Sequence, residues 1–190
     1  PYRTWRWWHK LSGPLFLVVV LHWLSFKQPL PLSSPAGIWL ATLSVLGVAG
    51  ASWKLLLYPL LTNRAEYRVV SVTPGSAAIH MTLEPIRKGI DFHPGQFGFL
   101  RMNAHGLREP HPFTIATGNR GDGRVEFVIR ALGDYTGKLV AEARVGMHAD
   151  LEAPFGRFAR RPVVQREVWI GGGVGISPFT TAFSRCTASP

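Results

Sequence analysis

The sequence has little cysteine and little negative charge. Its 190 residues contain one cysteine, Cys186, which excludes internal disulfides, iron–sulfur clusters held by four cysteines and cysteine-based zinc sites. Any redox chemistry must therefore use a bound organic cofactor or haem. The chain has only 11 acidic residues against 21 lysines and arginines, which gives it a formal net charge of +10. The basic residues form no block with interleaved aromatic residues, so we expect no nucleic-acid partner.

The positive excess has two readings that the sequence leaves open. It suits anionic lipid headgroups and phosphate-bearing cofactors, or it is simply a solvated surface. The chain begins at Pro1 and shows no signal-peptide pattern, so we expect a piece of a longer protein.

Two long apolar runs dominate the first 61 positions. They cover residues 11–26 and 37–61, and tryptophans flank the first. Runs of this kind bounded by interfacial aromatic residues indicate membrane helices. Residues 28–34 contain Pro29 and Pro31, which end a helix and make a turn. Lysine and arginine gather before the first run and after the second, so the positive-inside rule places both ends in the cytoplasm.

From residue 62 onward the hydrophobic period changes from helical to alternating. Residues 67–73, 77–83 and 124–130 alternate as strands do. The glycine-containing turns that interrupt the strands are expected at residues 74–75, 94–95 and 121–123. This spacing predicts a small antiparallel β-barrel, with one helix over residues 136–144. The apolar residues 168–170 precede a run of glycines, the pattern that opens a βαβ unit. We therefore expect two membrane helices in residues 1–61, the barrel in residues 62–165, and the start of an α/β domain in residues 166–190.

Two histidines lie in or beside the first apolar run. His9 sits at its cytoplasmic edge and His22 near its far end. Imidazole is a natural axial ligand of haem, and ionisable residues at membrane depth are costly. A step of thirteen residues separates the two histidines by about 20 Å along a helix axis. It also points the two rings in well-separated directions around that axis, unless a kink at Gly13-Pro14 changes the direction of one of them. The alternative is an interfacial His9 and a hydrogen-bonded His22.

Two short motifs in the barrel suggest a flavin. In His111-Pro-Phe-Thr114, Phe113 can lie against a flat ring while Thr114 offers a hydroxyl and an amide to its polar edge. Gly133-Asp-Tyr-Thr136 opens a helix, whose amides and the Thr136 hydroxyl suit a phosphate, with Arg130 just upstream. The alternative for the second motif is an N-capped helix with no ligand.

A glycine-rich turn near the C-terminus suggests a second nucleotide. Its candidate residues are Gly171, Gly172, Gly173, Gly175, Ser177 and Pro178. Missing side chains let a pyrophosphate approach the backbone, and proline suits the first turn of the following helix. A glycine cluster by itself is often only a tight turn.

Taken together, these motifs resemble the ferredoxin reductase module in its ferric reductase and NADPH oxidase form. The motifs that carry the resemblance are Pro94-Gly-Gln-Phe97, His111-Pro-Phe-Thr114, Gly133-Asp-Tyr-Thr136, Ala153-Pro-Phe-Gly156 and residues 171–178, after the histidine-bearing helix. The resemblance implies the last two helices of a six-helix haem domain, a barrel that binds FAD, and the first turn of an NAD(P)-binding domain.

The resemblance also implies roles for individual residues. His9 and His22 would ligate haem b. His111, Pro112, Phe113 and Thr114 match the stretch that contacts the flavin ring and ribityl chain, and the stretch from Arg130 through Gly133 to Thr136 lies around its pyrophosphate. Phe155 matches the loop near the nicotinamide, and with Thr114 is the candidate catalytic pair. The nicotinamide domain stops early, and Cys186 is not equated with any family cysteine.

The expected function is transmembrane electron transfer from NAD(P)H through FAD to haem b, and on to a small-molecule acceptor such as a ferric chelate or oxygen. Its partners would be the lipid bilayer and the missing membrane helices of the full-length chain, in a plasma or inner membrane with the FAD and NAD(P) domains cytoplasmic. One alternative is a membrane-anchored NAD(P)H:flavin reductase that serves a cytoplasmic partner without haem. Another is a non-enzymatic scaffold.

Overall fold

The computed structural model describes residues 2–25, 30–117, 121–158 and 168–180. They divide into two compact units, Pro1–Leu61 and Thr62–Pro190, which we treat separately. Cys186 lies outside the described residues.

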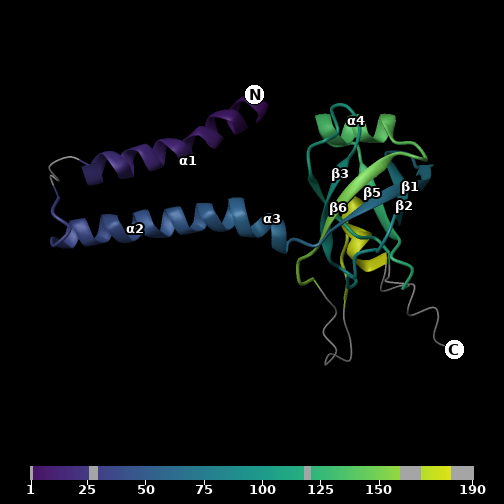
Figure 1. The fold of residues 1–190 in the computed structure, drawn as a ribbon. Helices are drawn as coiled ribbons and strands as arrows, with labels where there is room; N and C mark the ends of the chain where they lie inside the picture. Colours follow the sequence, from purple (N-terminus) through teal and green to yellow (C-terminus); the bar gives the residue numbers. More distant parts are fainter. Residues whose placement is uncertain (1, 26–29, 118–120, 159–167, 181–190) are drawn as a thin grey trace. The chain divides into compact units, whose positions relative to one another are not determined.

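The regular elements of the first unit are all helices in its described residues. Helix α1 spans Tyr2–Ser25, and α2 (Pro35–Ser52), the π-helical η1 (Trp53–Leu57) and α3 (Tyr58–Leu61) follow one another without a break (Figure 1). Ser34 begins the second stretch, because its hydroxyl oxygen accepts the Gly37 N–H at 3.1 Å and Pro35 fits the first turn. The Phe16 ring of α1 packs where a Cβ on Gly47 of α2 would lie, so this glycine permits the close approach of the two helices.

The structure contains one helix long and apolar enough to cross a membrane among its described residues. It is the stretch Pro35–Leu61, 27 residues long and exposed along most of its length. The first expected span, residues 11–26, corresponds within the described residues to the apolar helix Leu11–Ser25, which is shorter than a full span. A hydrocarbon core of about 30 Å needs roughly 20 apolar residues. By length and composition alone, one of the two expected spans is long enough, and the membrane insertion of both stays a prediction.

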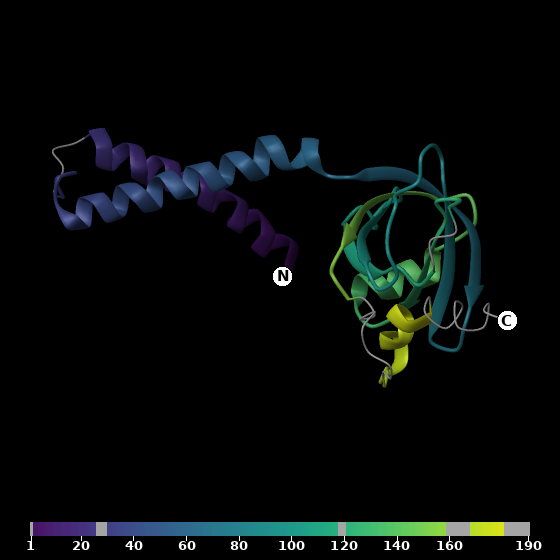
Figure 2. The same cartoon turned by 90° about the horizontal axis from the view of Figure 1, so that it is seen from below.

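The second unit is a nearly closed antiparallel barrel, as predicted. Its strands are β1 (Arg64–Pro74), β2 (Ala78–Pro85), β3 (Phe97–Met102), β4 (His111–Thr114), β5 (Val125–Arg130) and β6 (His148–Phe155). They pair in the order β4-β3-β6-β1-β2-β5, and Figure 2 shows the ring that they form. The ring is completed where the Ala116 N–H, just after β4, donates to the Glu126 carbonyl of β5 at 2.7 Å.

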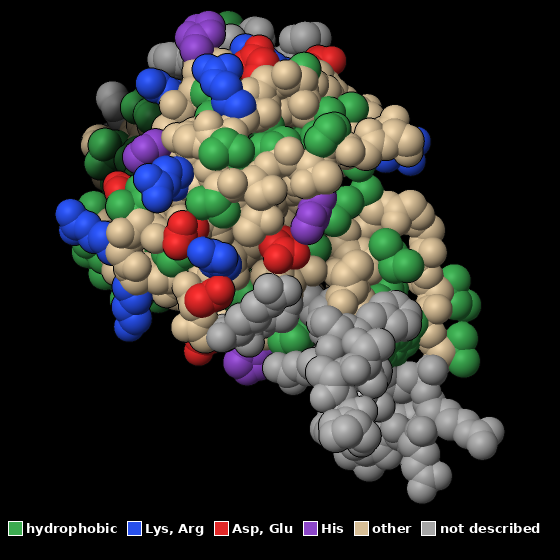
Figure 3. Space-filling view, turned by 90° about the vertical axis from the view of Figure 1, so that its right-hand side faces the viewer, with side chains coloured by type: hydrophobic (Ala, Val, Ile, Leu, Met, Phe, Trp, Pro, Cys, Tyr) green, Lys and Arg blue, Asp and Glu red, His purple; other side chains and the backbone are tan. Residues whose placement is uncertain are grey.

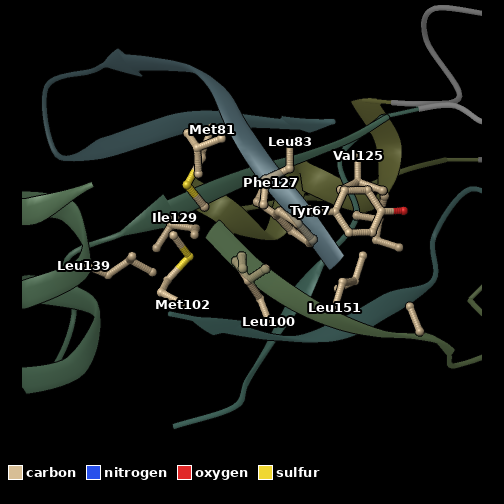
Figure 4. Close-up of a cluster of buried hydrophobic side chains, with 14 of the residues drawn as sticks. Tyr67, Met81, Leu83, Leu100, Met102, Val125, Phe127, Ile129, Leu139 and Leu151 are labelled. Atoms are coloured by element: carbon tan, nitrogen blue, oxygen red, sulfur yellow. The ribbon is translucent and has the colours of Figure 1, made fainter. Parts of the chain in front are cut away.

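Alternation along the strands fills the barrel. Every second residue points inward, as in Ile79, Met81 and Leu83 of β2, and all three are at most 3% exposed. Figure 4 shows this cluster, to which α4 adds Leu139. Helix α4 spans Asp134–Glu142 and lies across one end of the barrel (Figures 1 and 2). It begins and ends two residues earlier than predicted, because Gly133 is its N-cap and Ala143 leaves the helical conformation.

The outer face of the barrel is polar and mixed in charge. Arg64 pairs with Glu152 at 2.8 Å across β1 and β6, and Arg124 pairs with Glu84 at 3.3 Å. Figure 3 shows acidic and basic side chains interspersed on one face of the molecule. These pairs are exposed, so each contributes about 1 kcal/mol or less and the interior carries most of the stability.

Tyr67 joins two connecting segments from inside the barrel. Its hydroxyl donates to the Gly123 carbonyl at 3.1 Å and accepts the buried Ile90 N–H at 3.0 Å. Gly89 and Gly123 meet at the same place, where a Cβ on Gly89 would come within 2.6 Å of the Gly123 Cα. Burial raises the pKa of Tyr67, partly opposed by the Ile90 bond. A neutral hydroxyl therefore connects β1 to the segments before β3 and β5.

We expect Tyr67→Phe to lower the free energy of unfolding by about 1–3 kcal/mol, because it leaves the buried Ile90 N–H without an acceptor. Urea unfolding measures the change. Thr73→Val, at an exposed position of the same strand, is the control and should shift the value by less than about 0.5 kcal/mol. Equal effects of the two substitutions would contradict this role for Tyr67.

Candidate functional site

Strand pairing brings three of the sequence motifs into one row. Thr114 of β4 lies opposite Phe97 of β3, and Phe97 lies opposite Phe155 of β6. Residues directly opposite share a face of the sheet, so the three side chains are neighbours. The Phe97 and Phe155 ring centroids are 5.7 Å apart. The two candidate catalytic residues, Thr114 and Phe155, therefore lie on the two strands that flank β3, with the Phe97 ring between them.

Gln96 fixes the end of this row. Its backbone carbonyl accepts the Ile115 N–H at 3.0 Å, and its side-chain Nε2 donates to the Gly156 carbonyl at 3.2 Å. The preceding Gly95 has φ +86°, and a Cβ there would meet the Phe158 carbonyl oxygen at 1.9 Å. Only glycine fits this position. The Pro94–Phe97 motif thus ties the end of β4 to the end of β6, a connection that its residue types did not reveal.

The four residues of the His111–Thr114 motif differ in exposure. Pro112 is exposed, and Thr114 is half-buried. Phe113 packs partly on the core, with its ring edge-on to Phe127 at 6.3 Å, and keeps part of its surface accessible. Contact of Phe113 and Thr114 with a flat ring stays a prediction.

The His111 ring instead packs against α4. It stacks on the Tyr135 ring with centroids 3.7 Å apart and an angle of 24°. The Tyr135 hydroxyl donates to the Leu107 carbonyl at 3.1 Å. Burial and then the nearby Glu109 carboxylate raise the pKa of Tyr135 to about 12. Sequence reasoning missed Tyr135, although an aromatic residue in the first turn of the helix was a visible signal.

The start of α4 is built around Gly133 and Thr136. The Thr136 Oγ1 accepts the N–H groups of Leu132 and Gly133, both at 3.0 Å, and donates to the Gly133 carbonyl. This hydroxyl, predicted to bind phosphate, therefore holds the helix start in this structure. The first backbone hydrogen bond of the helix runs from the Gly137 N–H to the Gly133 carbonyl. The amides of residues 134–136 precede this bond, so they have no carbonyl acceptor within the helix and can donate to a ligand.

The glycine-rich turn approaches the barrel through Arg130. A Cβ on Gly173, which has φ +54°, would lie 3.8 Å from Nη1 of Arg130. The Thr180 hydroxyl donates to the Ala116 carbonyl at 2.8 Å, which joins the segment after the turn to the end of β4. Arg130 thus lies near both predicted phosphate sites.

The glycine-rich segment itself differs from the expected strand and turn. Residues 168–170 form no strand, since a strand needs a paired neighbour and the described residues supply none. Gly173–Ile176 is a 3₁₀ turn, η2, and residues 177–180 are helical with Pro178 in the first turn, as predicted. Ser177 is 3% exposed and donates to the Val174 carbonyl at 2.6 Å, so its hydroxyl serves the turn.

Apart from Gly173, the predicted nucleotide-binding glycines fall into two groups. A Cβ on Gly133, Gly172 or Gly175 would meet no atom within 4 Å, so these backbones face open space. A Cβ on Gly171 would lie 3.1 Å from the Ile176 Cα, so this glycine is needed by the turn itself.

The residues present fit the pyrophosphate of FAD. Gly133 is exposed, the first-turn amides of α4 lie beside it, and Arg130 has no carboxylate partner in the described part of the chain. A helix N-terminus with an adjacent guanidinium is a suitable environment for a phosphate group. Asp134 lies in the same turn and is the one acidic group there.

The two histidines predicted to ligate haem lie on α1, and both are exposed. The His9 ring stacks on Trp5 at 5.0 Å with an angle of 8°. The helix runs through Gly13-Pro14 as an unbroken α-helix, so the two imidazoles stay about 140° apart around its axis. Gly13-Pro14 therefore does not bring the two rings onto one side of the helix. Haem ligation stays a prediction.

Comparison with known proteins defines the class of the barrel. Residues 62–155 match the family model described as an FAD-binding domain. Among solved structures, the ferredoxin reductase of carbazole 1,9a-dioxygenase matches with a TM-score of 0.59 and 26% identity, covering 67% of this chain and 40% of that one. Residues 62–155 are therefore an FAD-binding domain of the ferredoxin reductase type. A flavohemoglobin from Malassezia yamatoensis shares the fold, with a TM-score of 0.53, 19% identity and coverage of 78% and 42%.

Curated relatives are parts of oxygenase systems. Methane monooxygenase component C of Methylosinus trichosporium is 36% identical over 96 residues, which is 48% of this chain and 27% of that protein. The anthranilate 1,2-dioxygenase electron transfer component of Acinetobacter baylyi is 28% identical over 121 residues, or 63% and 35%. The chain thus spans about a third or less of the length of these relatives.

We expect Gly133→Val to weaken FAD binding at least about tenfold, because its side chain would occupy the space through which a phosphate reaches the α4 amides. The fold should tolerate it, since the position has extended backbone angles (φ −144°) and no atom within 4 Å of a Cβ. Gly137→Ala, equally open but inside the helix, is the matched control and should keep FAD affinity. Titration of the apoprotein with FAD, followed by flavin fluorescence, measures both.

We expect the free energy of unfolding to fall as pH rises from about 10 through about 12, because folded Tyr135 keeps its proton to about pH 12 and an unfolded tyrosine only to 10.0. Tyr135→Phe removes this contribution and should flatten the pH dependence. Urea unfolding at a series of alkaline pH values compares the two proteins. Identical slopes would show that Tyr135 does not titrate as its burial implies.

Proposed function

We propose that this chain is the central part of a membrane oxidoreductase that passes electrons from NAD(P)H through FAD to haem b, and from there to a ferric chelate or oxygen. One observation carries the proposal: the FAD-binding barrel begins at Arg64, three residues after the apolar stretch Pro35–Leu61 ends. In this arrangement the flavin domain is tethered directly to a helix long enough to span a bilayer.

FAD would supply the conversion between the two-electron chemistry of nicotinamide and the one-electron chemistry of haem. Arg130 and the amides of α4 would hold its pyrophosphate. Phe113 would lie against the flavin ring and Thr114 at its polar edge. Phe155, held beside Phe97, would border the nicotinamide, whose pyrophosphate would approach residues 171–178.

His9 and His22 would hold haem b, with the second axial ligands coming from other membrane helices of the full-length chain. The protein would be integral to a plasma or inner membrane, with its FAD and NAD(P) domains in the cytoplasm. The exposed apolar surface of Pro35–Leu61 supports this arrangement, as do the basic residues before the first apolar run and after the second.

A second candidate function is supported by the curated relatives. Two of them are named as component C of a monooxygenase and as the electron transfer component of a dioxygenase. By this analogy the chain would be an NAD(P)H:flavin reductase that uses its helix as an anchor and serves a cytoplasmic partner without haem. The two functions share the FAD site and differ in whether the membrane part holds haem.

We expect His9→Ala and His22→Ala in the full-length protein to abolish reduction of haem while reduction of FAD by NAD(P)H continues, because an axial ligand is lost and the barrel is untouched. Absorption spectra of isolated membranes follow haem and flavin separately. Trp5→Phe, which keeps an aromatic ring beside His9, is the control and should retain the haem spectrum. Unchanged haem spectra in both histidine variants would contradict the assignment of His9 and His22 as haem ligands. Absence of a haem spectrum from membranes that hold the unmodified protein would favour the oxygenase-partner function.

A further inference from the structure

Three side chains form a cluster between β4 and α4. His111 stacks on Tyr135 at 3.7 Å, and its Nε2 is buried 3.9 Å from a carboxylate oxygen of Glu109. The Tyr135 hydroxyl is bonded to the Leu107 carbonyl. Leu107 is fully buried, and its carbonyl also accepts the Met102 N–H at the end of β3. Tyr135 is therefore anchored on a packed segment of the barrel.

The cluster connects the two halves of the flavin site. His111 is the first residue of β4 and Thr114 the last, so the strand covers about 10 Å between them. Tyr135 is the second residue of α4, in the turn whose amides would bind the pyrophosphate. A flavin dinucleotide places a ribityl chain between its ring and its phosphates. The stack therefore sets how far the phosphate end of the site lies from the ring end.

We propose that His111 and Tyr135 are positioning residues that hold the start of α4 at the distance from β4 that FAD requires. The proposal rests on the proposed FAD site and changes the expected role of His111 from direct flavin contact to support. Burial of Nε2 and coverage of one ring face by Tyr135 argue for this change.

A ligand pair separates positioning from general stability. Lumiflavin carries the ring alone, whereas FAD must engage both ends of the site at once. We expect Tyr135→Leu to weaken FAD binding about tenfold and lumiflavin binding less than about twofold, because only FAD depends on the spacing. Flavin fluorescence titrations of the same apoprotein preparation measure both affinities.

Two conservative variants test the mechanism further. Tyr135→Phe keeps the stack and should restore FAD affinity to within about threefold of the original. His111→Phe also keeps an aromatic pair and removes the imidazole. FAD affinity within about threefold is expected for a positioning residue, and a loss as large as that of Tyr135→Leu would identify His111 as a direct ligand.

Tyr67→Phe is the control for a purely structural effect. Tyr67 lies in the barrel interior away from both motifs, so its substitution should lower stability without changing the ratio of FAD to lumiflavin affinity. Equal weakening of both ligands by Tyr135→Leu, or no weakening of FAD, would overturn the positioning role. Failure of the unmodified chain to bind FAD would instead contradict the proposed function, and the inference with it.

Discussion

Closure of the barrel between β4 and β5 is the constraint on which the rest of the site depends. β4 has only four residues. It pairs with β3 at one edge of the sheet, and β5 forms the other edge. The bond from the Ala116 N–H to the Glu126 carbonyl brings these edges together. Everything assigned to flavin then lies along this junction: Thr114 on one side, Arg130 and Gly133 on the other. The segment that follows the glycine-rich turn is attached to the same junction through the Ala116 carbonyl.

Stability and function have different origins in this domain. The barrel interior is filled by fully buried side chains from alternating strand positions, and Tyr67 closes one side of it with two hydrogen bonds. The junction between β4 and β5 contributes buried residues too, among them Ile115 and Phe127. It holds its shape through the stacked pair His111 and Tyr135 and through Gln96, which joins the ends of β4 and β6. A ligand that bridges β4 and α4 would stabilise the domain further, because it binds the folded state and not the unfolded chain.

The barrel could be predicted from sequence because its signals are local. Alternation over residues 67–73, 77–83 and 124–130 corresponds to β1, β2 and β5, and the positive φ of Gly95, Gly121 and Gly123 matches the expected turns. The stack of His111 on Tyr135 could not be predicted in this way, since it joins residues 24 positions apart in sequence whose approach depends on barrel closure. For Thr136 the sequence left two roles open, a phosphate contact or a cap of the helix, and in the structure its hydroxyl bonds to local backbone groups at the helix start. The expected strand at 168–170 failed because a strand depends on a neighbour that periodicity does not reveal.

The central claim is that the barrel binds FAD at the junction of β4 and β5. The most direct test is calorimetric titration of the purified apoprotein with FAD and, separately, with FMN. The account predicts one FAD per chain and weaker binding of FMN, which lacks the adenylate half and its second phosphate. Absence of FAD binding, or equal affinity for FMN, would contradict it.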